Sequence, residues 1–204
     1  MFKFRKIKRW YKEWYFKRYG IDKKDYAKIS SFGLPILDIK GHLQIDTRIH
    51  LTNTLSESTL GVNRPCKFLI YENAYLHFKG YCGMSNTVII AAKGITIGER
   101  VIIGAGCTIM DTDCHSLEPT EWMTEEDELH AQKKEIVIGD NVFLGTQCII
   151  LKGVHIGDNS IIAAGSVVSR DVPANQIWGG NPAMYLKENS FNSSHENFHN
   201  NTHL

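Results

Sequence analysis

Two carboxylates and an imidazole alternate within the segment 109–117, which reads Ile-Met-Asp-Thr-Asp-Cys-His-Ser-Leu. Histidine suits general-base chemistry on a hydroxyl group, because the unperturbed pKa of imidazole is about 6.5. In an extended chain alternate residues point to the same side, so Asp113 is the nearer candidate to fix the tautomer of His115. The alternative interpretation is that Asp111 and Asp113 only shape a turn and that His115 is exposed to solvent.

The residues on both sides of this segment repeat with a period of six. An aliphatic side chain occupies every sixth position in two runs, and a glycine follows several of these positions directly. This period predicts a parallel β-helix, in which three units close one triangular coil around a column of aliphatic side chains. The glycine is expected to provide the backbone angles of the corner. The aliphatic positions are Ile97, Ile103 and Ile109, then Ile138, Leu144, Ile150, Ile156, Ile162 and Val168, and the glycines are Gly98, Gly104, Gly139, Gly145 and Gly157.

The repeat is interrupted immediately after the candidate histidine. Ile109 and Ile138 are 29 positions apart, which is not a multiple of six, so a loop over residues 116–135 is predicted to leave the prism. This loop has seven acidic residues and a proline but no period. His115 would then be fixed by a rigid strand on one side and overhung by the loop on the other, which favours a general base there. Residues 34–94 have a poorer register and are expected to add two or more irregular coils.

The chain ends differ in character from the repeats, and they divide the chain into three regions. Residues 1–30 are basic and aromatic, residues 31–187 form the β-helix domain, and the Asn-, Ser- and His-rich residues 188–204 are expected to be a disordered tail. Aromatic spacings of three and four predict an N-terminal amphipathic helix that stops at Gly20. Two interpretations stay open for this helix: a cap on the prism, or an interfacial helix attracted to anionic lipid.

Composition narrows the classes of protein. Residues 1–28 contain 11 Lys and Arg against three acids, while the chain as a whole has a net charge of +1, so no basic patch follows elsewhere and nucleic-acid binding is disfavoured. The five cysteines are an odd number without a CxxC spacing, which argues against a disulfide framework and a zinc site. No run of 18 apolar residues is present. We expect a cytoplasmic protein, with peripheral attachment to the inner face of a membrane left open.

From about residue 86 to residue 187 the chain resembles the hexapeptide-repeat O-acetyltransferases of the maltose/galactoside acetyltransferase type. The residues that carry the resemblance include ITIGERVIIGAGCTIMDTDCHSL and the terminal GGNPAMYLK. It is most similar to the sugar acetyltransferases of capsule and lipopolysaccharide assembly. The resemblance implies a left-handed β-helix, a homotrimer with sites between subunits, acetyl-CoA as co-substrate, a saccharide acceptor that is small or linked to lipid, and no metal.

The same resemblance assigns roles to residues. His115 would be the base in a direct acyl transfer, and Asn86 would bind substrate. Beside these, Asp113 is expected to support His115, and Asp111 is expected to bind substrate. The position of Phe143 often carries Trp in the family, so its apolar wall is retained without an indole N–H. After Asn181-Pro182 a short C-terminal cap helix is expected. The implied residues of the CoA groove are Phe143, Gly145, Thr146, Ala164, Gly165, Ser169, Arg170 and Lys187.

Three other functions remain open. An antibiotic-modifying acetyltransferase of the same repeat type is compatible with the long loop. A metalloenzyme resembling γ-class carbonic anhydrases would need three histidines around zinc, and His115, His130 and His155 are the candidates, although no two are at a tight ligand spacing. A non-catalytic prism is disfavoured by the presence of His115. Serine acetyltransferases are disfavoured because residues 1–30 are too short for their N-terminal helical domain.

Overall fold

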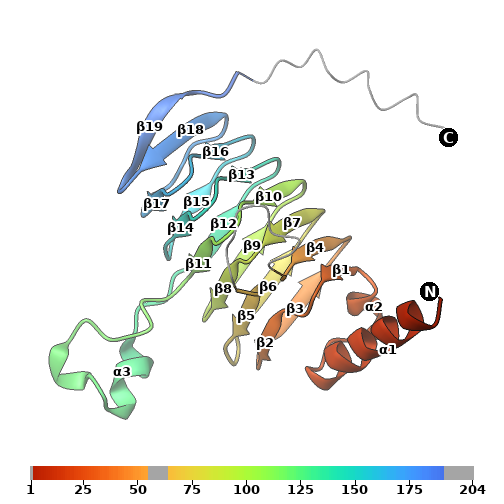
Figure 1. The fold of residues 1–204 in the computed structure, drawn as a ribbon. Coiled ribbons are helices and arrows are strands. Elements are labelled where there is room, and N and C mark those ends of the chain that lie inside the picture. Colours follow the sequence, from red (N-terminus) through yellow and green to blue (C-terminus); the bar gives the residue numbers. More distant parts are fainter. Residues whose placement is uncertain (1, 55–63, 191–204) are drawn as a thin grey trace.

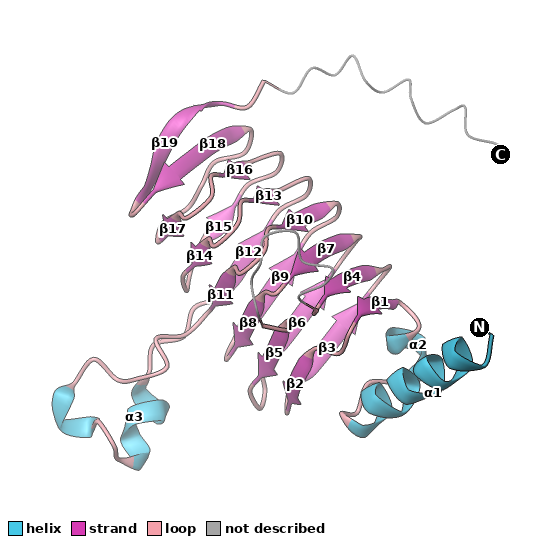
Figure 2. Ribbon diagram, in the orientation of Figure 1, coloured by secondary structure: helices cyan, strands magenta, loops and turns pink. Residues whose placement is uncertain are grey.

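The chain forms a stack of triangular coils in a computed structural model (Figures 1 and 2). The structure describes the backbone of residues 2–54 and 64–190, and side chains within these ranges from residue 10 onward. Successive strands pair in parallel with strands one coil away, and this pairing builds three sheets in the described residues. The predicted parallel β-helix is therefore confirmed, including two or more coils within residues 34–94.

Each sheet is one face of the prism. Face A contains β1 (Ile29–Phe32), β4 (Ile49–Thr52), β7 (Cys82–Ser85), β10 (Val101–Ile103), β13 (Phe143–Leu144), β16 (Ile161–Ile162), β18 (Gln176–Gly180) and β19 (Ala183–Glu188). Face B contains β2 (Ile36–Ile39), β5 (Lys67–Ile70), β8 (Val88–Ala91), β11 (Thr108–Met110), β14 (Ile149–Ile150) and β17 (Val167–Val168). Face C contains β3 (His42–Ile45), β6 (Tyr75–Phe78), β9 (Gly94–Ile97), β12 (Ile136–Ile138) and β15 (His155–Ile156).

The aliphatic column predicted from the six-residue period lies on the axis of the prism. Ile97, Ile109, Ile150 and Val168 have no exposed surface, and the other predicted positions are at most 2% exposed. Neighbouring coils place equivalent residues in register, as with Ile109 beside Ile150. Burial of one aliphatic side chain per unit, at roughly 1.5–3 kcal/mol each, is the repeated contribution that holds the coils together.

The glycine after each aliphatic residue has a different purpose from the one predicted. A Cβ on Gly104 would lie 2.5 Å from the backbone nitrogen of Thr146 in the next coil, so glycine permits close stacking. The positive φ of the corner occurs two residues later, at +78° for Gly106, +57° for Asn141 and +58° for Asn159. The side chains of Asn141 and Asn159 form a hydrogen bond of 2.9 Å that continues the stack outside the core.

The predicted N-terminal helix is α1 (Phe2–Arg18), followed by the short α2 (Lys23–Tyr26). Gly20 ends α1 with a φ of +74°, as expected for a helix stop. Both helices lie at the β1–β3 end of the stack, and the side chains of Phe16 and Tyr26 belong to the buried core (Figure 1). Phe4 and Ile7, which share the spacing of this helix face, precede the described side chains. In the described residues, no helix combines the length and hydrophobicity that a membrane crossing requires.

The interruption of the repeat is an excursion between β11 and β12 that projects sideways from the prism (Figure 1). It contains a short 3-10 helix, η1 (Pro119–Glu121), and α3 (Glu125–His130). The predicted loop is thus confirmed, although it leaves the coil earlier than residue 116. A second excursion, residues 53–66 between β4 and β5, was not predicted, and its residues 55–63 lie outside the described part.

The prediction of a C-terminal cap helix after Asn181-Pro182 is wrong. Ala183–Glu188 forms β19, which pairs antiparallel with β18 and covers the last strand of face A. The unpaired backbone edge of β18 offers hydrogen bonds that a helix at this position would leave unmade. Residues 191–204 of the expected disordered tail lie outside the described residues.

Candidate active site

The candidate base His115 stands on a stalk formed where the excursion leaves the prism. The two strands of the stalk are joined by hydrogen bonds from Asp113 N–H to the Gln132 carbonyl at 3.0 Å and from Lys134 N–H to the Asp111 carbonyl at 2.9 Å. A β-bridge between Thr112 and Lys133 lies between them. Paired backbone on both sides fixes the direction in which the histidine leaves the coil.

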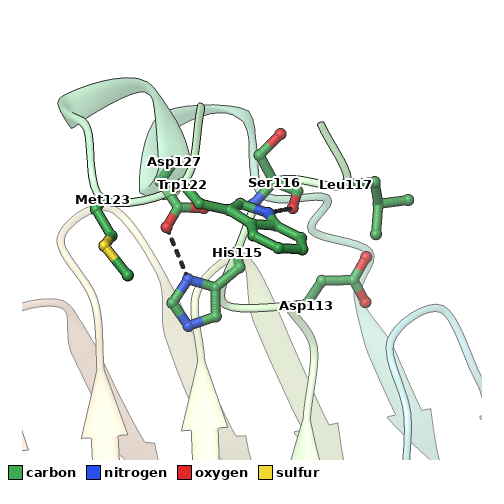
Figure 3. A pocket seen from close by; sticks show the side chains of 7 residues that line it. All are labelled: Asp113, His115, Ser116, Leu117, Trp122, Met123 and Asp127. Atoms are coloured by element: carbon green, nitrogen blue, oxygen red, sulfur yellow. Dashed lines mark hydrogen bonds and ion pairs between the residues drawn. The ribbon is translucent and has the colours of Figure 1, made fainter. Parts of the chain in front are cut away.

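His115 is paired with Asp127 of α3. His115 Nδ1 lies 2.9 Å from Asp127 Oδ2, and the Ser116 N–H donates to Asp127 Oδ1 at 2.8 Å. The hydrogen bond from His115 holds the pKa of the Asp127 carboxyl below its ordinary value, with a smaller contribution from the Ser116 amide. A carboxylate on Nδ1 selects the tautomer whose Nε2 has a free lone pair, and Figure 3 shows this nitrogen on the side of the ring away from Asp127.

The surrounding loop is tied together through Ser116. Its hydroxyl donates to Glu121 Oε2 at 2.5 Å, and its carbonyl accepts the indole N–H of Trp122 at 2.8 Å. Glu121 Oε1 is in turn 2.8 Å from His130 Nδ1. The hydrogen bond from Ser116, followed by the one from His130, lowers the pKa of Glu121. These contacts fix the position of α3 and hence of Asp127.

A cavity of about 590 Å³ opens beside His115. The side chain of His115 is 71% exposed there, whereas that of Asp127 is 10% exposed. Leu117, Trp122 and Met123 give the cavity an apolar wall, and the other lining residues add a few polar groups, as in small-molecule sites. Figure 3 shows the seven residues that line it: Asp113, His115, Ser116, Leu117, Trp122, Met123 and Asp127.

The two aspartates singled out in the sequence have other partners. Asp113 does not fix the tautomer of His115, since its Oδ1 pairs with Lys152 Nζ at 2.6 Å, although the residue does line the cavity. Asp111 is buried, and its carboxylate accepts the backbone N–H groups of residues 92, 93 and 94 at 2.6, 2.9 and 2.6 Å. In this structure Asp111 shapes the turn of the preceding coil, and its role in substrate binding stays a prediction.

Comparison with known proteins places this chain in a family. A family model described as bacterial transferase hexapeptide (six repeats) matches residues 135–170, and one described as hexapeptide repeat of succinyl-transferase matches residues 85–110. Galactoside O-acetyltransferase of Escherichia coli is 31% identical over 67% of this chain and 64% of that protein, and the enzyme of Lactococcus lactis is 37% identical over 64% and 63%. The chain belongs to the hexapeptide-repeat acetyltransferase family.

A solved structure of a hexapeptide-repeat acetyltransferase from Vibrio cholerae agrees with this membership. It is 26% identical, covers 78% of this chain and 74% of its own, and superposes with a TM-score of 0.50. A structure of the same Vibrio protein contains acetyl coenzyme A. The matches span slightly less than two thirds of the length of the two galactoside O-acetyltransferases.

Asn86, the substrate-binding residue implied by the family, lies far from the cavity in a single chain. It precedes β8 at one edge of face B, whereas His115 follows β11 at the opposite edge. Its side chain is fully buried and donates to the Arg64 carbonyl, while the Arg64 guanidinium donates to the carbonyls of Asn86 and Gly106. In this chain alone Asn86 therefore stabilises a corner, and it does not contact the His115 cavity.

The residues of the CoA groove implied by the family fall into separate groups. Phe143, 44% exposed, lies on face A, and the corner between faces A and B holds Gly145, Thr146, Ala164 and Gly165. Ser169 and Arg170 follow β17 at the corner between faces B and C, which is also the corner from which His115 emerges. Lys187 is on β19. The residues implied for the CoA groove therefore lie on different corners of one prism, and their role in binding CoA stays a prediction.

The sequence analysis did not identify Asp127, Glu121 and Trp122 as residues that support His115 or line the cavity. The signal for α3 was present, because Thr124 is followed three residues later by an acid, and the structure shows the Thr124 hydroxyl accepting the Glu126 N–H at 3.2 Å as an N-cap. What the sequence did not contain is the fold-back of the loop that brings this helix to His115. Within the described residues, no group of three His, Cys, Asp or Glu side chains is arranged to hold a metal ion.

Proposed function

We propose that this protein transfers an acetyl group from acetyl-CoA to a hydroxyl group of a sugar, with His115 as general base and Asp127 as its positioning residue. The observation that carries the proposal is the His115–Asp127 pair at the mouth of an apolar cavity on a hexapeptide prism. The reaction of the galactoside O-acetyltransferase relatives and the acetyl coenzyme A bound to the Vibrio protein support the same chemistry.

The transfer needs one proton acceptor and no covalent enzyme intermediate. His115 Nε2 removes the proton from the acceptor hydroxyl as its oxygen attacks the thioester carbonyl, and the tetrahedral oxyanion then collapses with cleavage of the C–S bond. The imidazolium returns the proton to the departing CoA thiolate, so the protein ends in its starting state. Asp127 supports this cycle by holding the ring and stabilising the imidazolium.

A homotrimer would bring together the predicted site residues that lie on different corners of one chain. If parallel prisms pack side by side, the corner of one chain with Gly145 and Thr146 can face the corner of its neighbour with His115 and Arg170. The cleft between them would hold CoA, with the cationic Arg170 and Lys187 available to phosphates and Phe143 to the pantetheine arm. Asn86 would enter the site from the neighbouring chain only after Arg64 releases it.

The N-terminal segment supports a place at the cytoplasmic face of a membrane, and a saccharide of cell-surface polysaccharide or lipopolysaccharide assembly as acceptor. Trp10 and Trp14 of α1 are 66% and 45% exposed, and Lys17 and Arg18 are exposed beside them. Amphipathic aromatic rings with cations are the side chains that favour an anionic lipid interface. Flotation with anionic liposomes tests the contact: the full chain should float, and a chain carrying Trp10→Ser and Trp14→Ser should stay in the soluble fraction.

Thiol release from acetyl-CoA tests the activity, with galactosides, other sugars, and chloramphenicol- or aminocyclitol-type drugs as acceptors. We expect turnover on a sugar, and a loss of about 10²-fold or more in kcat for His115→Ala. Binding of CoA to His115→Ala, measured by calorimetry, should stay close to that of the unchanged protein. Turnover confined to the drugs would favour the antibiotic-modifying class, and full activity of His115→Ala would disprove the base assignment.

A further inference from the structure

The two sides of α1 have different surroundings. One side faces the prism: Phe16 is buried, the Tyr15 hydroxyl donates to the Pro35 carbonyl at 2.7 Å, and Lys12 donates to the Ser31 carbonyl. In a helix with 100° between residues, Trp10, Trp14 and Lys17 lie on the opposite side. Helix α1 is therefore both a cap on the prism and a carrier of an exposed face, which we call the Trp10–Trp14 face.

The Trp10–Trp14 face lies at one end of the prism, and the cations Lys17 and Arg18 lie beside its tryptophans. Figure 1 shows α1 across the β1–β3 end of the stack, opposite to β18 and β19. The Arg18 guanidinium lies 5.6 Å from the centre of the Trp14 ring, and Tyr11 stacks on Trp14 with ring centres 5.9 Å apart. Lys23 and Lys24 of α2 are also exposed. Aromatic rings interleaved with cations complement an anionic bilayer.

The candidate active site lies at a fixed distance along the prism from this end. On face B, β11 is separated from β2 by the two strands β5 and β8, and His115 leaves the coil directly after β11. Three steps of about 4.8 Å place the coil of His115 about 14 Å from the first coil. Helix α1, with a diameter of about 10 Å, adds to this distance. The excursion with α3 projects sideways, so it does not return His115 to the α1 end (Figure 1).

From this geometry we infer that the stack of coils holds His115 about 20 Å above an anionic membrane bound by the Trp10–Trp14 face, and that the acceptor is an outer sugar of a saccharide anchored in that membrane by a lipid. This inference rests on the proposed sugar acetyl transfer. A sugar attached directly to the lipid phosphate would lie at the headgroups, well below the imidazole. The reaction that supplies the substrate is then the extension of a lipid-linked saccharide by glycosyl transfer.

A lipid-linked saccharide on the membrane that binds the protein should react faster than a free sugar in solution. An acceptor and an enzyme held on the same membrane meet at a high effective concentration. In a trimer of parallel prisms, all three Trp10–Trp14 faces would be at the same end, which adds avidity and keeps the threefold axis perpendicular to the membrane. Each His115 would then lie at the same height.

The height is tested by tryptophan quenching with brominated lipids in anionic vesicles. One variant retains Trp10 and Trp14 and carries Trp122→Phe and Trp178→Phe; the other retains only Trp122, beside His115. We expect strong quenching of the first variant and none of the second while both float with the vesicles. Quenching of Trp122, or a lack of quenching of Trp10 and Trp14, would overturn the orientation. Trp10→Phe and Trp14→Phe keep an apolar ring, so the Trp122 variant still binds.

The substrate class is tested with galactosyl oligosaccharides of increasing length linked to prenyl diphosphate in the same vesicles, and with the same saccharides released from lipid. We expect acetylation of sugars away from the lipid, little transfer to the shortest chain, and a rate at least tenfold above that of the released saccharides. Trp10→Ser with Trp14→Ser should lose this advantage while acting on released saccharides at the original rate.

The results of these assays distinguish the inference of a membrane-anchored acceptor from the proposed sugar acetylation. Equal transfer to short and long chains, or equal rates on linked and released saccharides, contradicts this inference but leaves sugar acetylation standing. Failure to release thiol with every saccharide, linked or free, counts against the proposed function itself.

Discussion

At the scale of residues, the structure assigns the support of His115 to Asp127 instead of Asp113. Alternation along a strand predicted Asp113, but the extended chain ends at Cys114, whose φ is +64°. That left-handed residue turns the chain, so positions 113 and 115 no longer share a side. Asp127, which pairs with His115 instead, lies 12 residues after His115 in the sequence. No local sequence pattern links these two residues.

Replacing each aspartate separates these two assignments. Asp127→Asn should lower kcat by about 10²-fold, because an amide can present its N–H to Nδ1 and select the wrong tautomer. Asp113→Asn should have a smaller effect on kcat, since its contact is with Lys152. Glu128→Gln, an exposed neighbour on α3, is the matched control. A pH profile of kcat for Asp127→Asn that matches the unchanged enzyme would contradict the positioning role.

At the scale of elements, the excursion is organised by carboxylates. Hydrogen bonds from His115 to Asp127 and from Ser116 to Glu121 each lower the pKa of the accepting carboxyl. A group whose pKa is lower in the folded state stabilises that state above its ordinary pKa, and the contribution is lost as the pH falls through the lowered value. The excursion should therefore be stable at neutral pH and loosen in acid before the prism does.

The indole of Trp122 reports this loosening. Below about pH 4, where carboxyl groups begin to protonate, its emission should shift to longer wavelength as the contact with Ser116 opens. Subtracting the spectrum of Trp122→Phe isolates this signal from the other tryptophans. Far-UV circular dichroism serves as the control for the prism. Emission of Trp122 that stays constant until the strands unfold would show that the carboxylates do not hold the loop.

The glycines at the coil corners give a second prediction at this scale, which concerns the stability of the stacked coils. Gly104→Ala places a Cβ 2.5 Å from the Thr146 nitrogen and should cost about 1–3 kcal/mol, since the neighbouring backbone cannot yield without separating the coils. Gly83→Ala in β7 is the control, because its Cβ meets nothing nearer than the Tyr81 hydroxyl at 4.0 Å. Thermal unfolding compares the two, and equal midpoints would contradict the stacking role.

At the scale of the whole molecule, the proposed trimer makes two impaired chains complementary. Phe143→Ala should raise KM for acetyl-CoA, and His115→Ala should lower kcat, yet these residues lie on different sides of one prism. Trimers assembled from both variants would contain some clefts with neither change. With acetyl-CoA well below KM, mixed samples should therefore exceed the mean activity of the two separate samples. Activity equal to the mean of the two separate samples would place the complete site within one chain.

The sequence predicts those parts of the structure in which the interactions follow a short repeat, and it does not predict contacts between segments far apart in the chain. Ile103, Leu144 and Ile162 repeat because every coil contacts only its neighbours, so a short period determines the stack. β19 was mistaken for a helix because Ala, Met, Leu, Lys and Glu are strong helix formers, and only the open edge of β18 favours a strand. The Asp127 contact and the Arg64–Asn86 contact join distant segments, which residue spacing alone cannot reveal.

The two covered ends of the prism have one further consequence. Parallel coils could in principle continue without limit, since each offers the next an open row of backbone donors and acceptors. Here α1 and α2 close one end, and the antiparallel β19 closes face A at the other. A chain trimmed of either closure would expose a template for end-to-end growth. Filaments, visible by electron microscopy, would then be the expected fate of truncated protein.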